Sequence, residues 1–370
     1  MSALLGIRRY GIEALRELMA SWGEKGFRAT QLLRWLYARQ ATSYQEMTTL
    51  PTVLREKLER LEPLALPQLL ERRVSLDGTR KFLLRLADGA TVETVGIPRS
   101  DKRLTVCFST QVGCAMGCAF CTTGTHGLTR SLVPGEMVDQ LTVVSQDFGT
   151  RITNAVAMGE GEPFANYAAT LDALRIMNSP SGLGIGARHL TVSSCGLLGP
   201  LRRFAQEPEQ FTLAISLHSA IQKTRNALMP ALVNQPLDAL RLALLSYGEK
   251  TGRRPSLEFA LIDNVNDTSR EITALIDFAH GMLCHVNLIP FNVLNGLHDA
   301  DTLSGAHNYG QTRRHDQVFA PSPAERVAAI ATRLQKVGIK CSVRRSRGAD
   351  IGGACGQLKG YCSDSEKGMS

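Results

Sequence analysis

The sequence lacks the segments that would place it in a membrane or send it through a secretory route. No apolar run approaches the 18 residues that a spanning helix needs, and the first residues, MSALLGIRRYG, lack a secretory pattern. These absences predict a protein without a membrane span in a reducing, cytoplasmic setting, where disulfide scaffolds are rare. The nine cysteines are therefore expected to act as metal ligands or catalytic thiols.

The chain also lacks extremes of composition. Its 370 residues are 44% hydrophobic and 21% charged, which is ordinary for a soluble globular protein. A chain of this length can bury a large core, and we expect one large domain with smaller additions. The net charge of +8 suits a nucleic-acid partner, but a charge of this size does not identify one.

Helices are expected in residues 1–65, which we interpret as an accessory domain. Apolar residues recur at helical spacing over 15–22 and again over 27–39, and Pro51 is typical of the start of a third helix. Each segment therefore has one apolar face to bury against the others.

Residues 66–100 change to a strand pattern. Two Asp-Gly pairs, at 77–78 and 88–89, are hairpin turn signals on either side of the strand-like segment 81–86. The pattern predicts a three-stranded β-meander that links the helices to the rest of the chain, and its last strand carries Glu93.

Strand and helix patterns alternate from residue 101 to 345. The strand-like segments are 104–109, 152–158, 188–194, 211–217, 256–262 and 284–290, with a last strand at 339–343. Helical segments between them include 136–148, 237–249, 270–281 and 323–336. Repeated βα units predict a parallel sheet, and six units are too few for an eight-stranded barrel. We therefore expect an α/β fold with an open, partial (β/α)6 barrel, followed by a loop and tail over 346–370.

Cys114, Cys118 and Cys121 form a C-x3-C-x2-C pattern directly after the first of these strands. Three thiolates can bind three irons of a [4Fe–4S] cluster and leave the fourth iron open for a ligand. Phe120 would shield one side of such a cluster. The pattern resembles the signature of radical S-adenosylmethionine (SAM) enzymes, whose open iron chelates SAM and whose cluster cleaves it to a 5′-deoxyadenosyl radical. A zinc site with His126 as a fourth ligand, and a segment without metal, are also compatible with the spacing.

Polar residues follow the ends of several predicted strands, where the site of a parallel βα barrel lies. Each of them alone is more often a turn former or a cap. Glycine permits close backbone approach, a carboxylate can hydrogen-bond a cationic amino group, and hydroxyl and amide groups suit a ribose and a carboxylate. Together they predict a SAM pocket made by Gly161, Glu162, Ser193, Ser216, Leu217, His218 and Asn292.

Motifs along nearly the whole chain resemble the RlmN/Cfr family of radical SAM RNA methyltransferases, and most closely its RlmN type. The matching segments are 27–37, 92–94, 109–114, 161–163, 216–218, 286–292 and 344–358. The resemblance implies methylation of adenosine C2 in 23S ribosomal RNA, at the peptidyl transferase centre, and in transfer RNA next to the anticodon. Enzymes of the Cfr type act at C8 instead.

The same resemblance implies two catalytic cysteines outside the cluster. Cys355 would be methylated by one SAM, and the radical from a second SAM would take a hydrogen from that methyl group so that the carbon adds to adenine. Cys107 would remove a proton from the adduct and resolve it through a transient disulfide with Cys355. Glu93 matches a residue proposed as a proton acceptor. From the residues alone, Cys107 reads as a core thiol, Cys355 as an inert loop thiol and Glu93 as a solvent-facing carboxylate.

The implied partners are RNA and a one-electron donor such as flavodoxin or ferredoxin, and the implied state is a monomer. The resemblance implies that residues 1–65 are an RNA-binding accessory domain, and arginine and lysine contacts to phosphate would add to its affinity. The basic residues nearest the predicted site are Lys102, Arg103, Arg313, Arg314, Arg344, Arg345 and Arg347.

Three features depart from the family pattern. Glu160 stands where methionine is usual and would either alter SAM binding or point away; Cys195 replaces a small polar residue; and the polar segment 297–321 is longer than usual. They leave open a divergent paralogue acting on another RNA. The sequence is also compatible with a C8 methyltransferase, with a non-catalytic metal-containing RNA-binding protein, and with a glycyl-radical-activating enzyme, which would leave Cys107 and Cys355 without a role.

Overall fold

The computed structural model describes residues 5–125, 127–293 and 319–358. His126, Arg313, Arg314 and most of the long polar segment 297–321 lie outside the described residues. Among the helices that are described, none combines the length and the apolar character needed to cross a bilayer.

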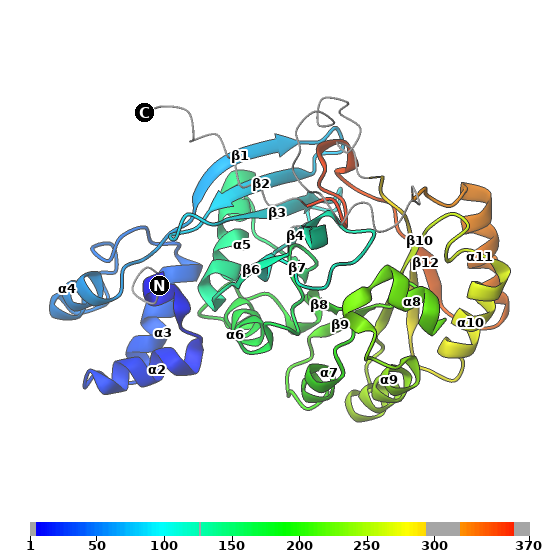
Figure 1. The fold of residues 1–370 in the computed structure, drawn as a ribbon. Helices are drawn as coiled ribbons and strands as arrows, with labels where there is room; N and C mark the ends of the chain where they lie inside the picture. The colour runs from blue at the N-terminus through cyan, green and yellow to red at the C-terminus, as the bar shows by residue number, and fades with distance from the viewer. Residues whose placement is uncertain (1–4, 126, 294–318, 359–370) are drawn as a thin grey trace.

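A ten-stranded sheet organises the molecule, in the order β1-β2-β3-β4-β7-β8-β9-β10-β11-β12 (Figure 1). Pairing is antiparallel from β1 to β4 and parallel from β4 to β12. The strands are β1 (Gln68–Val74), β2 (Arg80–Arg85), β3 (Thr91–Pro98), β4 (Leu104–Cys107), β7 (Asn154–Ala157), β8 (Leu190–Ser194), β9 (Thr212–Ser216), β10 (Ser256–Leu261), β11 (His285–Pro290) and β12 (Cys341–Val343). Within the described residues β12 pairs only with β11, so the sheet stays open.

The parallel part confirms the predicted partial barrel. Its strands are short and apolar because both faces are covered, and five of the six residues of β10 are buried. Figure 1 shows the helices along the outer side of the curved row of strands. They are α5 (Pro134–Phe148), α6 (Tyr167–Asn178), α7 (Leu198–Phe204), α9 (Leu237–Thr251), α10 (Ser269–Ala279) and α11 (Ala324–Lys336). The short helix α8 (Gln222–Leu228) lies apart from this outer row and follows the end of β9.

The predicted β-meander is also confirmed, as β1, β2 and β3. Gly78 and Gly89 occupy the two turns with φ angles of 82° and 86°, which a residue with a Cβ rarely adopts. The meander joins the barrel through antiparallel pairing of β3 with β4. Consequently Glu93 on β3 lies one strand away from Cys107 at the end of β4.

The N-terminal segment is helical, as expected, and packs against the barrel. It comprises the 3-10 turn η1 (Gly6–Arg9), α2 (Ile12–Ser21), α3 (Phe27–Leu33), the π-helical turn η2 (Arg34–Ala38) and α4 (Thr52–Leu61). Arg8 is 1% exposed and forms an ion pair of 3.1 Å with Asp139 on α5. Gly135 allows this approach, because a Cβ there would lie 2.7 Å from the Cβ of Arg8.

Candidate active site

A short antiparallel ribbon that sequence analysis did not predict holds both ends of the cysteine loop. It consists of β5 (Gln111–Gly113) and β6 (Leu128–Ser131). The Cys114 N–H donates to the Gly127 carbonyl at 2.7 Å. Gly113 has a φ of 74°, and a Cβ there would lie 2.1 Å from the same carbonyl oxygen. Glycine is therefore required where the ribbon enters the loop.

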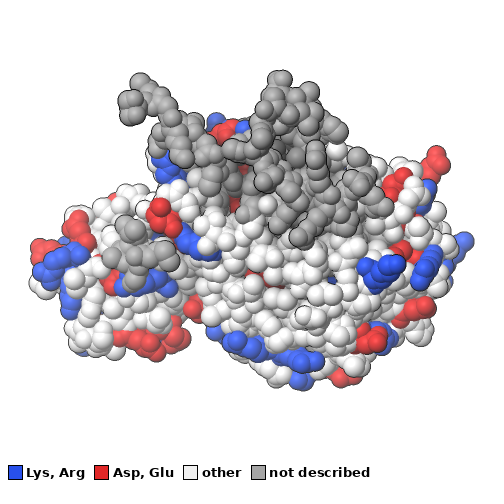
Figure 2. Space-filling view, in the orientation of Figure 1, with Lys and Arg blue, Asp and Glu red and all other residues white. Residues whose placement is uncertain are grey.

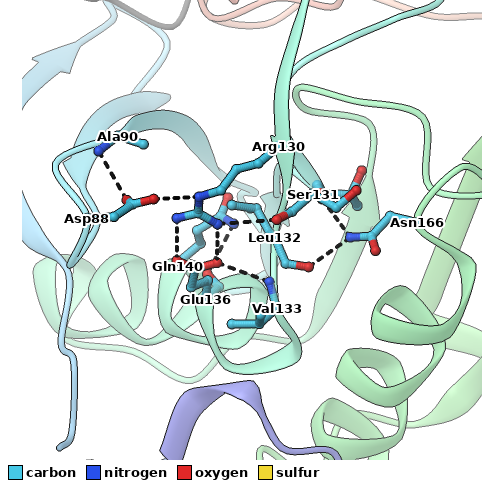
Figure 3. Close-up of polar contacts among 10 residues, drawn as sticks. Asp88, Ala90, Arg130, Ser131, Leu132, Val133, Glu136, Gln140 and Asn166 are labelled. Atoms are coloured by element: carbon cyan, nitrogen blue, oxygen red, sulfur yellow. Dashed lines mark hydrogen bonds and ion pairs between the residues drawn. The ribbon is translucent and has the colours of Figure 1, made fainter. Parts of the chain in front are cut away.

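Polar side chains fix this ribbon to the barrel (Figure 3). The Arg130 guanidinium donates to Asp88 at 2.6 Å and, through its two terminal nitrogens, to both carboxylate oxygens of Glu136 at 2.8 and 2.9 Å. The Asn166 amide donates to the Thr110 carbonyl at 2.9 Å and to the Leu132 carbonyl at 2.8 Å. The stem before the loop and the stem after it are thus held by one side chain, which limits how far the three cysteines can move.

The three thiols lie in a low-dielectric setting beside one another. Burial raises the pKa of Cys114 to about 11, and burial together with the charges of Cys121 and Cys114 raises the pKa of Cys118. Burial also raises the pKa of Cys121. Because each thiolate would repel the others, a deprotonated set is stable only when a metal centre neutralises it, so the donor chemistry fits a cluster.

A single metal ion fits the cysteine loop less well. Among the described residues, no three Cys, His, Asp or Glu side chains are placed to share one ion. Zinc would need its sulfur ligands within about 2.3 Å of one point, whereas a cluster gives each thiolate an iron of its own. The ring of Phe120 packs edge-on against His218, with 4.6 Å between the ring centroids, and so walls one side of the loop.

The loop after β7 brings Gly161 and Glu162 next to the cysteine loop. Gly161 has a φ of 97°, and a Cβ there would lie 2.5 Å from the Cβ of Gln111. The Glu162 carboxylate is 4% exposed and accepts the N–H groups of Cys195 at 2.8 Å and Phe164 at 2.9 Å. Burial raises the pKa of Glu162. The two hydrogen bonds orient a carboxylate whose charge also reaches Cys118.

Four more of the predicted pocket residues stand at or directly after the ends of β8 and β9. Ser193 and Ser216 are partly buried in β8 and β9, and Leu217 packs in the core after β9. His218 accepts the Ala260 N–H on Nδ1 at 3.0 Å. Burial and then the charge of Arg225 lower the pKa of His218 to about 3, so the ring is neutral.

The C-terminal loop closes over the cysteine loop. The Gly356 carbonyl accepts the Thr122 N–H at 2.8 Å, and the Leu358 carbonyl accepts the Thr123 hydroxyl at 2.9 Å. Asn292, from the end of β11, donates to the Cys355 carbonyl at 3.1 Å. Asn292 therefore contacts the loop that carries Cys355, a placement that its predicted role in the pocket did not specify.

Cys107 and Cys355 meet at the junction of β4 and this loop. Cys107 is 8% exposed and packs with Val95 and Leu358. Burial, followed by the negative charge at Cys355, raises the pKa of Cys107 to about 12. Two thiols from opposite ends of the barrel sequence are thus close enough to interact electrostatically, and the charge at Cys355 also reaches Cys121.

Sequence analysis missed the environment of Arg344. We expected its guanidinium to contact RNA phosphate, but it is partly buried, and its pKa is raised most by the negative charge at Cys355 and also by Glu258 and Cys107. Arg347, from the same basic run, pairs with Asp77 at 3.3 Å. Nothing in the sequence distinguishes Arg344, which faces the thiols, from the arginines around it.

Glu93 does not face solvent, so the simpler interpretation of this strand carboxylate is wrong. It is 2% exposed and forms an ion pair of 2.8 Å with Lys81 on β2. Glu160 lies beside it: its carboxylate accepts the Glu93 N–H at 2.8 Å and the Gly113 N–H at 3.3 Å. Burial and the charge of Glu93 raise the pKa of Glu160 to about 7. The unusual carboxylate thus points toward β3 and the start of the cysteine loop.

Charged side chains are dispersed over the face seen in Figure 2. Lysines and arginines gather in separate groups over the N-terminal helices, along the lower edge and at the right, with acidic residues between them. The described residues on this face therefore do not form one continuous basic surface.

Two family models match the chain. The N-terminal domain of the ribosomal RNA large subunit methyltransferases matches residues 4–62, and the radical SAM superfamily matches residues 108–253. The first covers the helical segment and the second covers the cysteine loop with the strand ends through β9.

Curated relatives match over nearly the full length. The chain is 39% identical over 349 residues to a probable dual-specificity RNA methyltransferase RlmN of Thermoanaerobacter sp. (strain X514), covering 94% of this chain and 96% of the relative. It is 41% identical over 351 residues to a protein of the same name from Geobacillus kaustophilus, covering 94% and 90%. A crystal structure of a radical SAM methyltransferase from Sphaerobacter thermophilus superposes with a TM-score of 0.84 at 39% identity, covering 96% of this chain and 99% of that one.

Proposed function

Because the chain belongs to the RlmN family of radical SAM RNA methyltransferases, we propose that it methylates C2 of adenosine in RNA. The substrates proposed are 23S ribosomal RNA, at the peptidyl transferase centre, and transfer RNA, at the adenosine next to the anticodon. The name of the relatives, dual-specificity RNA methyltransferase, supports two kinds of RNA substrate. The target adenine must leave its stack to reach a site recessed at the strand ends.

Cys114, Cys118 and Cys121 would hold a [4Fe–4S] cluster, with SAM bound at the strand ends around Glu162. The cluster, when bound, supplies the electron that cleaves SAM to a 5′-deoxyadenosyl radical. The oriented carboxylate of Glu162 suits a cationic amino group. The neighbouring hydroxyls of Ser193 and Ser216, and neutral His218, offer donors and acceptors without adding charge.

One observation carries the proposal: Cys355 lies against the cysteine loop on one side and Cys107 on the other. The Thr122 N–H bonds the carbonyl of Gly356, next to Cys355, at 2.8 Å, and the charge at Cys355 is felt by both Cys121 and Cys107. A thiol in this position can receive a methyl group from one SAM and present it to the radical from a second. The resulting carbon then bonds adenine C2 while still attached to sulfur.

We propose that Cys107 resolves that adduct. After the adduct has given up its odd electron to a one-electron acceptor, which the oxidised cluster would supply, Cys107 would take the proton from C2. Attack of the Cys107 sulfur on the Cys355 sulfur would then form a disulfide and break the bond between carbon and sulfur, and the released carbon would gain a proton to become the methyl group. A thiol reductant would restore both thiols. Methylation of Cys355 removes the charge that helps to raise the pKa of Cys107, whereas Arg344 lowers that pKa. A larger fraction of Cys107 is therefore thiolate, the form that can take up a proton, once Cys355 carries carbon.

We propose Glu93 as a second proton acceptor. The Lys81 ammonium at 2.8 Å compensates its charge in a buried position. Lys81 also approaches the C-terminal loop, since a Cβ on Gly352 would lie 3.5 Å from its Nζ. The partners proposed besides RNA are a flavodoxin or ferredoxin as one-electron donor, and the proposed oligomeric state is a monomer.

Nucleoside mass spectrometry of ribosomal and transfer RNA, isolated separately from cells with and without this protein, tests the proposal. We expect 2-methyladenosine to disappear from both fractions when the protein is absent. Restoring the wild-type protein should restore the nucleoside, whereas the Cys355→Ala variant should not.

Each other outcome corrects a different part of the proposal. Loss of 2-methyladenosine from only one of the two RNA fractions would restrict the proposed substrate to that RNA. A change in 8-methyladenosine would replace C2 by C8, and unchanged RNA in both fractions would refute adenosine methylation and point to another substrate.

A further inference from the structure

Arg225 on α8 is a buried guanidinium that forms no ion pair with any acidic side chain among the described residues. It is 0% exposed. Its Nη2 donates to the Cys195 carbonyl at 2.6 Å and reaches the Ser216 carbonyl at 3.5 Å. Its Nε and Nη1 are buried without a hydrogen-bond partner in the described part of the chain. The side chain thus keeps its charge and two donors without partners, and within the described residues only carbonyl groups accept from its third nitrogen.

Arg8 shows what the protein does with another fully buried arginine. Arg8 has an ion pair of 3.1 Å with Asp139 and lies over the ring of Tyr37, 5.1 Å from its centroid. No carboxylate within the described residues forms an ion pair with Arg225. Because an arginine stays protonated and a buried unpaired charge costs several kcal/mol, the missing anion must come from elsewhere.

The groups that face Arg225 indicate where that anion forms. Its strongest favourable interactions are with the sulfurs of Cys195 and Cys118. The helix is fixed beside the cysteine loop, because the Ala119 N–H, next to Cys118, donates to the Leu228 carbonyl at 2.9 Å. Cys195 belongs to the apolar cluster under the loop, with its sulfur 3.5 Å from that of Met116. Of the two sulfurs, only Cys118 belongs to the predicted ligand set.

We propose that Arg225 is the countercharge of the iron–sulfur centre held through Cys118, and that it raises the reduction potential of that centre. The inference rests on the proposed cluster. Three thiolates give the centre negative charge, and reduction adds one more. A fixed positive charge in a dry pocket therefore stabilises the reduced form more than the oxidised form. Arg225 would act as a positioning and tuning residue, without touching RNA.

Redox titration followed by electron paramagnetic resonance, on anaerobically reconstituted full-length protein without SAM, tests this inference. Arg225→Met removes the charge and keeps an unbranched side chain, whereas Arg225→Lys keeps the charge. Arg241→Met is the matched control, because Arg241 also donates to two backbone carbonyls, those of Phe278 and His280, on the outer helices. At the wild-type midpoint potential we expect Arg225→Met to hold about tenfold less reduced relative to oxidised cluster, a shift of about 59 mV for one electron. Arg225→Lys and Arg241→Met should remain near the wild type.

Each of the other possible results also supports or overturns a stated part of this inference. An Arg225→Met potential equal to the wild type would overturn the inference, and weaker SAM binding alongside it would assign the charge to the SAM carboxylate. If Arg225→Met takes up no cluster, loading of Arg225→Lys supports a need for the charge. Failure of the lysine variant too, with Arg241→Met loaded, would mean that Arg225 acts through its carbonyl bonds alone. A wild-type protein that binds no cluster would refute the proposed function instead.

Discussion

The two groups of thiols in the site are built in opposite ways. Cys114, Cys118 and Cys121 come from eight consecutive residues between the two strands of one ribbon, and local hydrogen bonds fix their loop. Cys107 and Cys355 come from the first parallel strand and the C-terminal loop, and meet only because the barrel and meander bring those segments together. The geometry of a local motif depends only on its own backbone. The geometry of a distant pair depends on all the packing and strand pairing that brings the two segments together.

The largest expected effect is that one group of cysteines is needed to bind iron, whereas the other is needed only for methyl transfer. Cys118→Ala should lose both iron and methylation, because the loop then has too few ligands. Cys355→Ala should keep iron but reduce methylation to background, since the carrier sulfur is gone. Iron and sulfide content, measured beside product formation, tests both variants. Cys284→Ala, at a buried thiol before β11, is the control and should keep both properties. Iron loss in Cys355→Ala would mean that the groups are not independent.

A second prediction concerns the local backbone of the cysteine loop. Gly113 and Gly127 have similar φ angles of 74° and 70°, but a Cβ on Gly113 would meet the Gly127 carbonyl at 2.1 Å, and one on Gly127 meets no described atom within 4 Å. Alanine at either position pays about 1–2 kcal/mol for the left-handed conformation. Gly113→Ala should therefore lose most of its iron on reconstitution, and Gly127→Ala should keep most of it. Equal iron retention would show that the loop tolerates a shift at its entry.

A third, smaller effect sharpens the account of the distant pair. The charge at Cys355 raises the pKa of Cys107, and Arg344 lowers it, from the wild-type value of about 12. Cys355→Ala should therefore lower the pKa of Cys107, and Arg344→Gln should raise it. The pH dependence of Cys107 alkylation by iodoacetamide, followed by peptide mass spectrometry, measures both shifts. If the pH dependence of alkylation is the same in the wild type and both variants, Cys107 does not interact electrostatically with Cys355 or Arg344.

The smallest expected effect concerns Glu160. Its carboxylate accepts the N–H of Gly113, at the start of the cysteine loop, and the N–H of Glu93, on the strand that pairs with the strand of Cys107. The folded-state pKa of Glu160 is about 7, above the ordinary 4.5, so the folded protein keeps a proton that the unfolded chain has lost. Stability from this group is therefore lost as pH rises from about 4.5 to 7. Glu160→Gln should remove that slope and gain about 3 kcal/mol relative to wild type across the window.

Thermal unfolding of Glu160→Gln and wild type between pH 4.5 and 8 checks this prediction. Glu249→Gln, at an exposed position on α9, is the control. A constant difference between Glu160→Gln and wild type at every pH would mean that Glu160 stays ionised in the folded protein.

Regular patterns made most of the fold predictable. The Asp-Gly turns marked the meander, and apolar runs marked the six parallel strands and the edge strand β12. The ribbon of β5 and β6 escaped notice because three or four residues without alternation carry no strand signal. The partners of the predicted site residues were also out of reach. Lys81 could not be assigned to Glu93, nor Arg344 to the thiols, because the first pairing joins two strands and the second joins β4, the end of β12 and the C-terminal loop.

The sequence by itself determined the chemical inventory of this protein: a cysteine motif with its spacing, glycines where backbone segments approach, and acidic and hydroxyl groups at strand ends. These signals are local, so neighbouring residues suffice to express them. Only the tertiary structure decided which charges stand together in a dry environment. It buried Glu93 with Lys81, turned Glu160 toward β3, and set Arg225 beside Cys118 without a carboxylate. Such interactions depend on distance and dielectric, which the folded chain alone sets.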